Sequence, residues 1–232
     1  MDFATLREGF SIGVATKEDR NEIWNIFLEA FGSDELWKCL TKNVVDSKEL
    51  FPWLIAHMAP RYETPDTIVF KITENATGKI VAWGAIQVPW KFLETEQAEI
   101  LRAKAATFNP PPTIDGMNPE ILKQVEKSVY AARLFGYDPE NDYHRRGSMI
   151  RPGYQKMGFG TYIMHFCNQI CDAKGERQWA RSRPSSLSLF KKLGFVEKGN
   201  LDTNLKRWGG NKDKSGIPIL VRVPKSDKQR LF

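Results

Sequence analysis

Alternating hydrophobic and polar residues in the first ninety positions predict three β-strands. Residues 10–15 alternate in this way, and two longer runs, 67–73 and 80–88, are rich in β-branched and aromatic residues. The connection between these two runs contains Asn75 and Gly78, residue types that favour tight turns. We therefore expect 67–73 and 80–88 to pair as an antiparallel hairpin.

Hydrophobic residues at helical spacing predict helices beside this hairpin. In residues 15–31 they recur every three or four positions, and Thr16 is a residue type that caps helix N-termini. Residues 35–41 and 47–62 are further apolar stretches with the length of short helices. The first part of the chain therefore predicts both strands and helices.

The last ninety positions predict a similar mixture. Gly175 suits the C-terminus of one helix, and Pro184 suits the first turn of the next. The predicted elements are, in order, a strand at 143–150, a helix over 161–174, a strand at 178–181, a helix over 184–193 and strands at 195–198 and 217–223.

The strand at 143–150 carries polar residues on both of its faces. Strict alternation predicts two sets of side chains, because successive residues of a strand point to opposite sides of a sheet. One set is His144, Arg146, Ser148 and Ile150, and the other is Tyr143, Arg145, Gly147 and Met149.

A glycine-rich loop connects this strand to the helix that follows it. Such a loop presents consecutive backbone N–H groups at a helix N-terminus, where they bind anions. Gly158 and Gly160 remove the side chains that would keep a ligand at a distance, and Lys156 adds a positive charge. We expect the loop to bind a phosphate group; the alternative is an ordinary strand-to-helix turn.

The spacing Gln155-x-x-Gly158-x-Gly160 resembles motif A of the GNAT superfamily of acyl-coenzyme A dependent N-acetyltransferases. In that family the motif is Q/R-x-x-G-x-G/A, and it receives the pyrophosphate of coenzyme A. A second block, residues 182–195, resembles the family segment A-S-P-x-G-x-x-L-Y-x-K-x-G-F in the form found in GNAT proteins of fungi. Both blocks occur in the expected order, so the chain is identified as a member of this superfamily, most like the fungal branch.

The resemblance implies an α/β (α+β) fold. We expect a mixed, mostly antiparallel sheet of six to seven strands, flanked by helices and splayed between strands 4 and 5, with the fourth strand ending at Ile150 or Arg151. Residues 1–232 are expected to form a single N-acetyltransferase-like domain with a helical insertion at about 90–142. The insertion contains predicted helices at 94–106 and 119–135, around a proline-rich break at 109–113. It serves either as a lid or wall of the acceptor site or as a structural flap.

The resemblance also implies acetyl-coenzyme A as the acyl donor. In the family, the end of the fourth strand lies beside the pantetheine arm and the loop holds the pyrophosphate. The expected cofactor-binding residues are Met149, Ile150, Arg151, Gln155, Lys156, Met157, Gly158, Phe159, Gly160 and Thr161.

Acyl transfer to an amine requires a base, because only the neutral amine attacks the thioester. His144 occupies the strand position where some family members carry a base glutamate, and imidazole titrates near neutral pH. His144 is therefore our candidate base, with packing in the strand as its alternative role. Glu197 and Asp202 are weaker candidates for the base.

Phe190 departs from the family pattern, which has a tyrosine here as the proton donor to the leaving thiolate. A phenyl ring cannot donate a proton. Either another hydroxyl substitutes, from Tyr143, Ser182 or Ser188, or backbone dipoles and solvent help the thiolate to leave. A third alternative is a protein that binds acyl-coenzyme A without efficient turnover.

Composition and charge leave this interpretation in place. The 232 residues are 41% hydrophobic, and we expect no membrane span and no secretion signal. The cysteines, Cys39, Cys167 and Cys171, form no disulfide or metal-ligand pattern, as is usual in a reducing compartment. We expect a cytoplasmic protein, with the nucleus as the alternative.

The formal net charge of +6 raises the hypothesis of a nucleic-acid-binding protein. An anionic cofactor and general solvation account for the same charge, and we prefer them. The expected function is transfer of an acetyl group to a primary amine of a small molecule or peptide. The alternatives are a non-catalytic acyl-coenzyme A binding regulatory protein and, less favoured, a nucleic-acid-associated protein. The sequence makes no prediction of oligomeric state.

Overall fold

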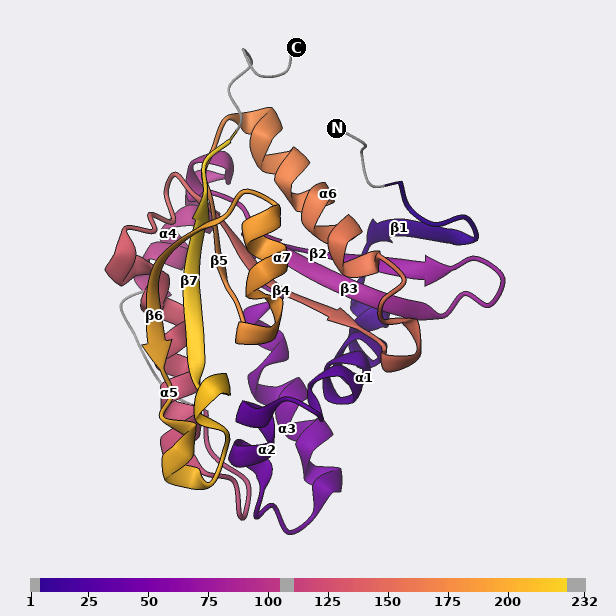
Figure 1. Cartoon of the computed structure of the whole chain (residues 1–232). Helices are drawn as coiled ribbons and strands as arrows, with labels where there is room; N and C mark the ends of the chain where they lie inside the picture. The colour runs from indigo at the N-terminus through magenta and orange to yellow at the C-terminus, as the bar shows by residue number, and fades with distance from the viewer. Residues whose placement is uncertain (1–4, 105–110, 225–232) are drawn as a thin grey trace.

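A seven-stranded sheet forms the centre of the computed structural model, which describes residues 5–104 and 111–224 (Figure 1). The strand order is β1-β2-β3-β4-β5-β7-β6, and every neighbouring pair is antiparallel except β4 and β5. The strands are β1 Phe10–Val14, β2 Thr67–Glu74, β3 Ile80–Gln87, β4 Tyr143–Ile150, β5 Gln178–Arg181, β6 Val196–Asp202 and β7 Gly216–Arg222. The predicted mixed, mostly antiparallel sheet and the end of the fourth strand at Ile150 are confirmed.

Helices cover both faces of the sheet. Helices α6 and α7 pack on one face, whereas α1, α2, α3 and α5 lie on the other (Figure 1). The helices are α1 Arg20–Phe31, α2 Glu35–Thr41, α3 Leu50–His57, α4 Thr95–Lys104, α5 Pro119–Tyr130, α6 Phe159–Lys174 and α7 Leu187–Lys192. Helices α4 and α5 lie between β3 and β4, where the insertion was expected. Part of the predicted proline-rich break, and the end of the helix at 94–106, lie outside the described residues.

Local sequence signals explain most of the helix boundaries. The Asp34 carboxylate accepts hydrogen bonds from the N–H groups of Leu36 and Trp37 and so caps α2, as expected of an N-cap aspartate. The predicted helix at 47–62 is instead α3 flanked by two 3₁₀ turns, Ser47–Glu49 and Ala59–Arg61. Pro60 lacks the N–H that an α-helix would need, which accounts for the break after α3.

A buried tryptophan fixes α1 against the sheet. Trp83 of β3 is fully buried, and its indole N–H donates to the Ile23 carbonyl at 2.9 Å. Trp24 and Tyr62 pack against this ring with centroids 6.0 and 5.6 Å away. A buried indole needs such a partner, because an unpaired donor would cost about 1–3 kcal/mol. Helix α1 is thereby held beside the end of β4.

Strands β4 and β5 separate after a short paired region. Only Tyr143, His144 and Arg145 pair with β5, whereas β4 continues to Ile150. The splay between strands 4 and 5 is therefore confirmed. It leaves the backbone of the second half of β4 without a neighbour on that side, which is the position expected of a ligand slot.

A β-bulge in β4 corrects the predicted faces of this strand. Ala85 pairs with Gly147 and Ile86 with Arg145, so Arg146 is an extra residue. Two residues on the bulged strand then oppose one on β3, and alternation reverses after the bulge. The α6 face carries Tyr143, Arg145, Ser148 and Ile150, and the opposite face carries His144, Arg146 and Met149. The predicted common face of His144 and Ser148 is wrong.

Candidate functional site

The loop before α6 has the geometry of an anion site. A 3₁₀ turn, Pro152–Tyr154, follows β4, and Lys156 and Gly158 then adopt left-handed backbone angles, φ 63° and 89°. Gly158 is the N-cap of α6, and no side chain caps this helix. The N–H groups of the first helical turn have no partner within a helix, and the helix dipole adds positive potential there. The loop therefore offers several donors to an anion.

Aromatic contacts hold this loop in place. Phe159 is buried with its ring centroid 4.8 Å from that of Phe10, and the Tyr154 hydroxyl donates to the Glu74 carboxylate at 3.4 Å. The Gln155 amide donates to the Ile150 carbonyl at 3.3 Å. Because the Phe159 side chain belongs to the core, only its backbone N–H faces the predicted anion site. Lys156 is exposed beside it.

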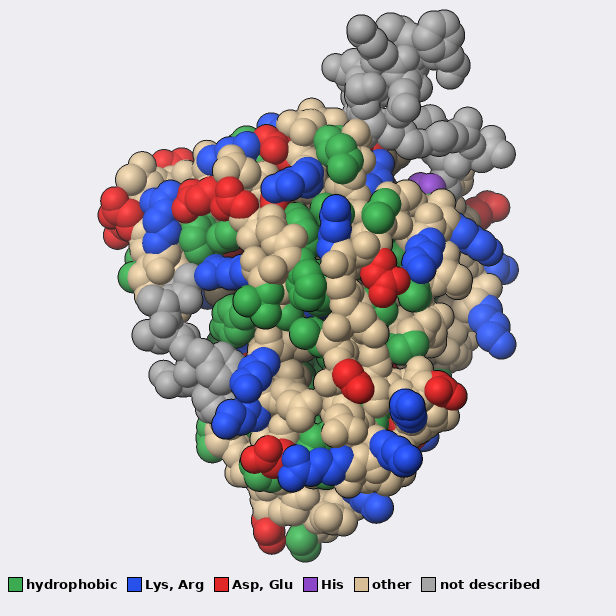
Figure 2. All heavy atoms as spheres, turned by 60° about the vertical axis from the view of Figure 1, so that its left-hand side comes forward, with side chains coloured by type: hydrophobic (Ala, Val, Ile, Leu, Met, Phe, Trp, Pro, Cys, Tyr) green, Lys and Arg blue, Asp and Glu red, His purple; other side chains and the backbone are tan. Residues whose placement is uncertain are grey.

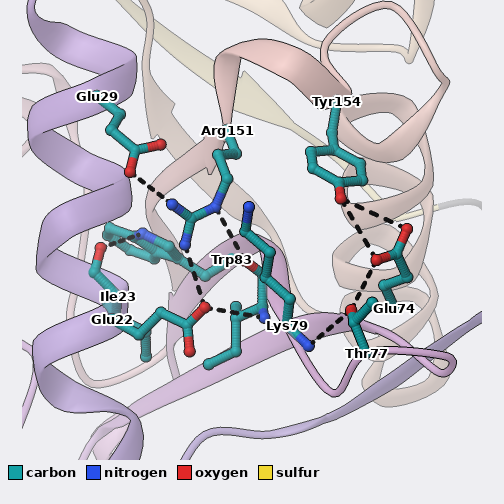
Figure 3. A network of polar contacts seen from close by, with 10 residues as sticks. Glu22, Ile23, Glu29, Glu74, Thr77, Lys79, Trp83, Arg151 and Tyr154 are labelled. Atoms are coloured by element: carbon teal, nitrogen blue, oxygen red, sulfur yellow. Dashed lines mark hydrogen bonds and ion pairs between the residues drawn. The ribbon is translucent and has the colours of Figure 1, made fainter.

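Arg151 joins the end of β4 to α1 rather than lining a cavity (Figure 3). Its guanidinium contacts Glu29 at 2.5 Å, Glu22 at 3.1 Å and the Ile80 carbonyl at 3.2 Å. Its backbone N–H donates to the Val81 carbonyl at 2.9 Å. The cofactor contact predicted for Arg151 stays a prediction; in the structure its charged group and its N–H have partners within the protein.

A cavity of about 660 Å³ lies where β4 and β5 separate. Its walls come from the end of β4, the connection between α1 and α2, and the 3₁₀ turn Pro184–Ser186 before α7. The lining includes Ser148, Met149, Ile150, Gln155, Arg183 and Lys214. The structure thus brings together the predicted strand end, Gln155 of the loop, the second sequence block with its Arg183, and Lys214.

Ser148 and Arg145 form a polar pair that the sequence analysis missed. The buried Arg145 guanidinium donates to the Ser148 hydroxyl and lies over the Phe190 ring, 5.6 Å from its centroid. Its Nη1 has no hydrogen-bond partner in the described structure. The Ser148 hydroxyl donates to the Gly147 carbonyl at 2.9 Å and lines the cavity. The available signal was Gly147, because a glycine inside a strand often marks a bulge.

The candidate base lies apart from the loop. His144 is 1% exposed, on the face of β4 opposite Ser148, with the Tyr137 ring centroid 4.9 Å away. Neither imidazole nitrogen has a hydrogen-bond partner among the described residues. Burial, reinforced by the positive charges of Arg146, Arg181 and Arg133, holds the pKa of His144 well below its usual range. The imidazole is therefore neutral at physiological pH.

The other proton-transfer candidates do not line the cavity. Burial raises the pKa of Tyr143 to about 12, and this residue lies at the far end of β4 from the loop. The Ser182 hydroxyl donates to the Arg183 carbonyl, and Ser188 is exposed on α7. The remaining acidic candidates lie on β6, where Glu197 forms an ion pair with Lys191 at 3.3 Å. The N–H of Asn204 donates to the Asp202 carboxylate.

A stability measurement tests the buried, neutral state of His144. Its pKa in the folded protein lies below the unfolded value, so the unfolded chain binds a proton first as pH falls. The free energy of unfolding should therefore drop below about pH 6.5, by at most about 1.4 kcal/mol per pH unit. Denaturant titrations between pH 7 and 5 should show less of this loss in His144→Gln. Parallel curves for the two proteins would contradict the buried, unpaired state.

The cysteines of the described chain are buried, and the charges on one face of the molecule are of mixed sign. Cys39, Cys167 and Cys171 are buried free thiols, and burial raises their pKa values, as expected of packing residues. The described residues contain no cluster of His, Cys, Asp and Glu side chains suited to a metal ion, and none of the described helices is long and apolar enough to cross a membrane. On the face that carries α4, α5 and β6, acidic side chains are interspersed among the basic ones (Figure 2).

Comparison with known proteins gives likeness in structure alone. No family model and no curated protein sequence matches the chain. The C-terminal condensation domain of Ebony, solved with beta-alanyl-dopamine, has a TM-score of 0.63 at 11% identity, over 92% of this chain and 98% of that one. The mosquito protein arylalkylamine N-acetyltransferase like 5b has a TM-score of 0.55 at 15% identity, over 92% of this chain and 99% of that one.

A third similar structure comes from Corynebacterium glutamicum and is described as histone acetyltransferase HPA2 and related acetyltransferase. It has a TM-score of 0.55 at 13% identity, over 94% of this chain and 98% of that one. At such identities the likeness concerns the fold. The chain therefore has the GNAT fold, with a mostly antiparallel seven-stranded sheet that is splayed between β4 and β5.

Proposed function

We propose that this protein is an acetyl-coenzyme A dependent N-acetyltransferase that acts on a primary amine of a small molecule or peptide. The observation that carries the proposal is the uncapped N-terminus of α6 beside the cavity at the splay. The GNAT fold and the two sequence blocks, which resemble fungal members of that superfamily, support it.

The loop fits the proposed acyl donor. Acetyl-coenzyme A is the substrate that supplies the acetyl thioester and carries the phosphates. The backbone N–H groups from Lys156 to Thr161 would bind the pyrophosphate, since a helix N-terminus with glycines in the preceding loop binds phosphate through backbone donors. The N–H of Gln155, predicted to belong to this set, donates to the Pro152 carbonyl at 3.3 Å. Met149 and Ile150, which line the cavity, would contact the pantetheine arm through the free edge of β4.

His144 is the proposed base. The lowered pKa keeps the imidazole neutral over a wider pH range, which leaves its lone pair free, but it also makes the ring a weaker proton acceptor. Because His144 is buried, a water molecule would carry the proton from the amine to the ring. Its neutral state at physiological pH is compatible with this role.

In this proposal the Arg145 and Ser148 pair stabilises the leaving thiolate, which Phe190 cannot protonate. The hydroxyl lines the cavity with the buried Arg145 cation behind it, and it would stabilise developing negative charge by turning its proton from the Gly147 carbonyl toward the thiolate. This arrangement supports an enzyme over the non-catalytic acyl-coenzyme A binding alternative.

Removing the Ser148 hydroxyl should slow turnover. Ser148→Ala is expected to lower kcat by about 10²-fold, the usual loss on removing one donor to developing charge, with acetyl-coenzyme A affinity nearly unchanged. Adding Phe190→Tyr to this variant introduces a hydroxyl on α7, at the position of the family's proton donor, and should recover part of the rate. Ser188→Ala is the control, because Ser188 is exposed on the same helix. Unchanged turnover in Ser148→Ala would contradict this role.

Two measurements test the proposed function. Isothermal titration with acetyl-coenzyme A and, separately, with duplex DNA shows which ligand binds. A free-thiol assay over a panel of primary amines then measures transfer. We expect binding of acetyl-coenzyme A and amine-dependent thiol release. Binding without thiol release from any amine supports the non-catalytic alternative, and binding of DNA alone supports the nucleic-acid hypothesis.

A further inference from the structure

Two arginines flank the point at which β4 and β5 separate. Arg146 occupies the bulge of β4, directly after the last residue that pairs with β5, and Arg181 is the last residue of β5. Both side chains are turned to the sheet face opposite α6. Arg181 donates to the Ser128 hydroxyl of α5 at 2.7 Å, and Arg146 donates to the Gln87 side-chain oxygen at 3.2 Å.

Neither guanidinium has a carboxylate partner in the part of the chain that the structure describes. Arg181 donates to a hydroxyl and Arg146 donates to an amide oxygen, and both of these acceptors are neutral. The Arg146 guanidinium also lies over the Tyr62 ring, 5.7 Å from its centroid. Glu126 is the nearby buried acid, but Arg61 occupies both of its oxygens at 2.6 Å. The cluster therefore carries an excess of positive charge.

This excess is costly without a counter-ion. Burial and the charge of Arg146 lower the pKa of Arg181 to about 10, so the side chain stays protonated at neutral pH in spite of its surroundings. Buried charges in proteins are normally paired, because an unpaired one loses its hydration without compensation. Arg146 and Arg181 are nevertheless partly accessible to solvent as residues, and neither is in the fully buried core.

Two further features lie next to the arginines. His144, on the same face of β4, is almost completely buried with both nitrogens unpartnered. Gly147 follows Arg146, and a side chain added there would meet nothing closer than 3.7 Å, the Tyr62 hydroxyl and the Met149 methyl group. Met149 lines the cavity at the splay. The positive cluster and the proposed acyl-donor cavity therefore adjoin through the bulge.

We propose that Arg146 and Arg181 bind an anionic group of the acceptor, so that the acceptor is an amine carrying a carboxylate or phosphate close to the amino group. This inference rests on the proposed acetyltransferase function. Guanidinium groups bind such oxyanions through paired, charge-assisted hydrogen bonds. The anion between the arginines would place the amine beside His144 and the thioester cavity. Helix α5, from the insertion, is then a wall of the acceptor site, because Ser128 orients Arg181.

Matched amines test the proposal in the wild-type protein. β-Alanine and phenylalanine carry a carboxylate, 2-aminoethyl phosphate carries a phosphate, and ethylamine and phenethylamine carry neither. With acetyl-coenzyme A saturating, kcat/KM from thiol release should be about 10- to 100-fold higher for the acids, as expected for a charge-assisted contact. The carboxylate and phosphate arms identify which anion fits. A preference for the uncharged amines would overturn the proposal.

Arginine variants locate the contact. Arg181→Gln and Arg146→Gln should each lower kcat/KM for the preferred acid about 10- to 100-fold, mainly through KM, and should not produce this rise in KM for phenethylamine. Arg207→Gln is the control, because Arg207 is exposed on another surface. Thermal unfolding checks that each variant folds. Equal losses with acid and neutral amine, in variants that fold, would overturn the assignment.

A binding arm separates this proposal from the proposed function. Calorimetry with β-alanine, phenylalanine and 2-aminoethyl phosphate, in the presence of coenzyme A, does not depend on turnover. A protein that binds one of these acids through Arg181 but releases no thiol contradicts the transferase function and keeps the anion site. A protein that acetylates phenethylamine but binds none of the acids contradicts the anion site and keeps the function.

Discussion

Gly158→Val should lower the affinity for acetyl-coenzyme A by about 100-fold or more, which corresponds to the loss of one or two charge-assisted hydrogen bonds. Gly158 is the N-cap of α6 with φ 89°, a left-handed conformation that a valine rarely adopts. A side chain there would meet no protein atom within 4 Å, so it would stand in the space in front of the N–H groups. Both effects act on the proposed anion site, and calorimetry with acetyl-coenzyme A measures the outcome.

The same helix provides a matched control for backbone strain. Gly175 is the C-cap of α6, also left-handed with φ 70°, and a side chain there also meets nothing within 4 Å. Gly175→Val should cost similar stability and leave the affinity for acetyl-coenzyme A unchanged. If both variants bind as tightly as the wild type, the loop is not the pyrophosphate site. If both lose affinity equally, strain in α6 rather than blocked donors is the cause.

Patterns local to the sequence predicted the elements that frame the site. The hairpin of β2 and β3 came from two β-branched runs around a turn, and the end of β4 came from Pro152 and the glycines after it. In both, residues next to each other in the chain carry the structural information. Local propensity and the residue spacing in the loop are therefore sufficient to predict the elements that frame the predicted anion site.

Contacts between distant segments were not predictable in this way. The bulge at Arg146 arises from pairing with β3, and it moved Ser148 to the face of Arg145. Arg181 meets Ser128 from a helix that precedes it by 53 residues. Such partners depend on how the sheet is assembled, which periodicity along one strand does not report. The sequence therefore predicted the glycine-rich loop before α6, whose role as acyl-donor site stays a prediction, but it did not predict the contacts of the arginine pair or of the serine.

The two faces of β4 carry different parts of the proposed site. The α6 face carries Ser148 and Arg145, which serve the proposed leaving thiolate, and the opposite face carries His144 and Arg146, which serve the proposed acceptor. A regular strand would have placed His144 and Ser148 on one side. The single extra residue at the bulge therefore lets donor and acceptor chemistry approach the same strand from opposite directions.

Replacing the proposed base should have the largest effect on turnover. His144→Gln is expected to lower kcat about 10²- to 10⁴-fold, the usual range for losing a general base, because glutamine cannot accept the proton. Affinity for acetyl-coenzyme A should hardly change, since His144 lies apart from the loop. His165→Gln on α6 is the matched control. Unchanged kcat in a folded His144→Gln variant would leave His144 as a packing residue.

The pH profile gives this prediction a second readout that packing alone would not produce. Because the pKa of His144 lies below its usual range, the acidic limb of kcat/KM, which reports the free enzyme, should fall below pH 6.5. An anionic acceptor bound between Arg146 and Arg181 would offset the positive charges that depress this pKa, and so raise it in the complex. The acidic limb of kcat should then lie at a higher pH than that of kcat/KM for an amino acid, and the two limbs should coincide for phenethylamine. Both limbs should disappear in His144→Gln, and a profile that the substitution leaves unchanged would assign the titration to another group.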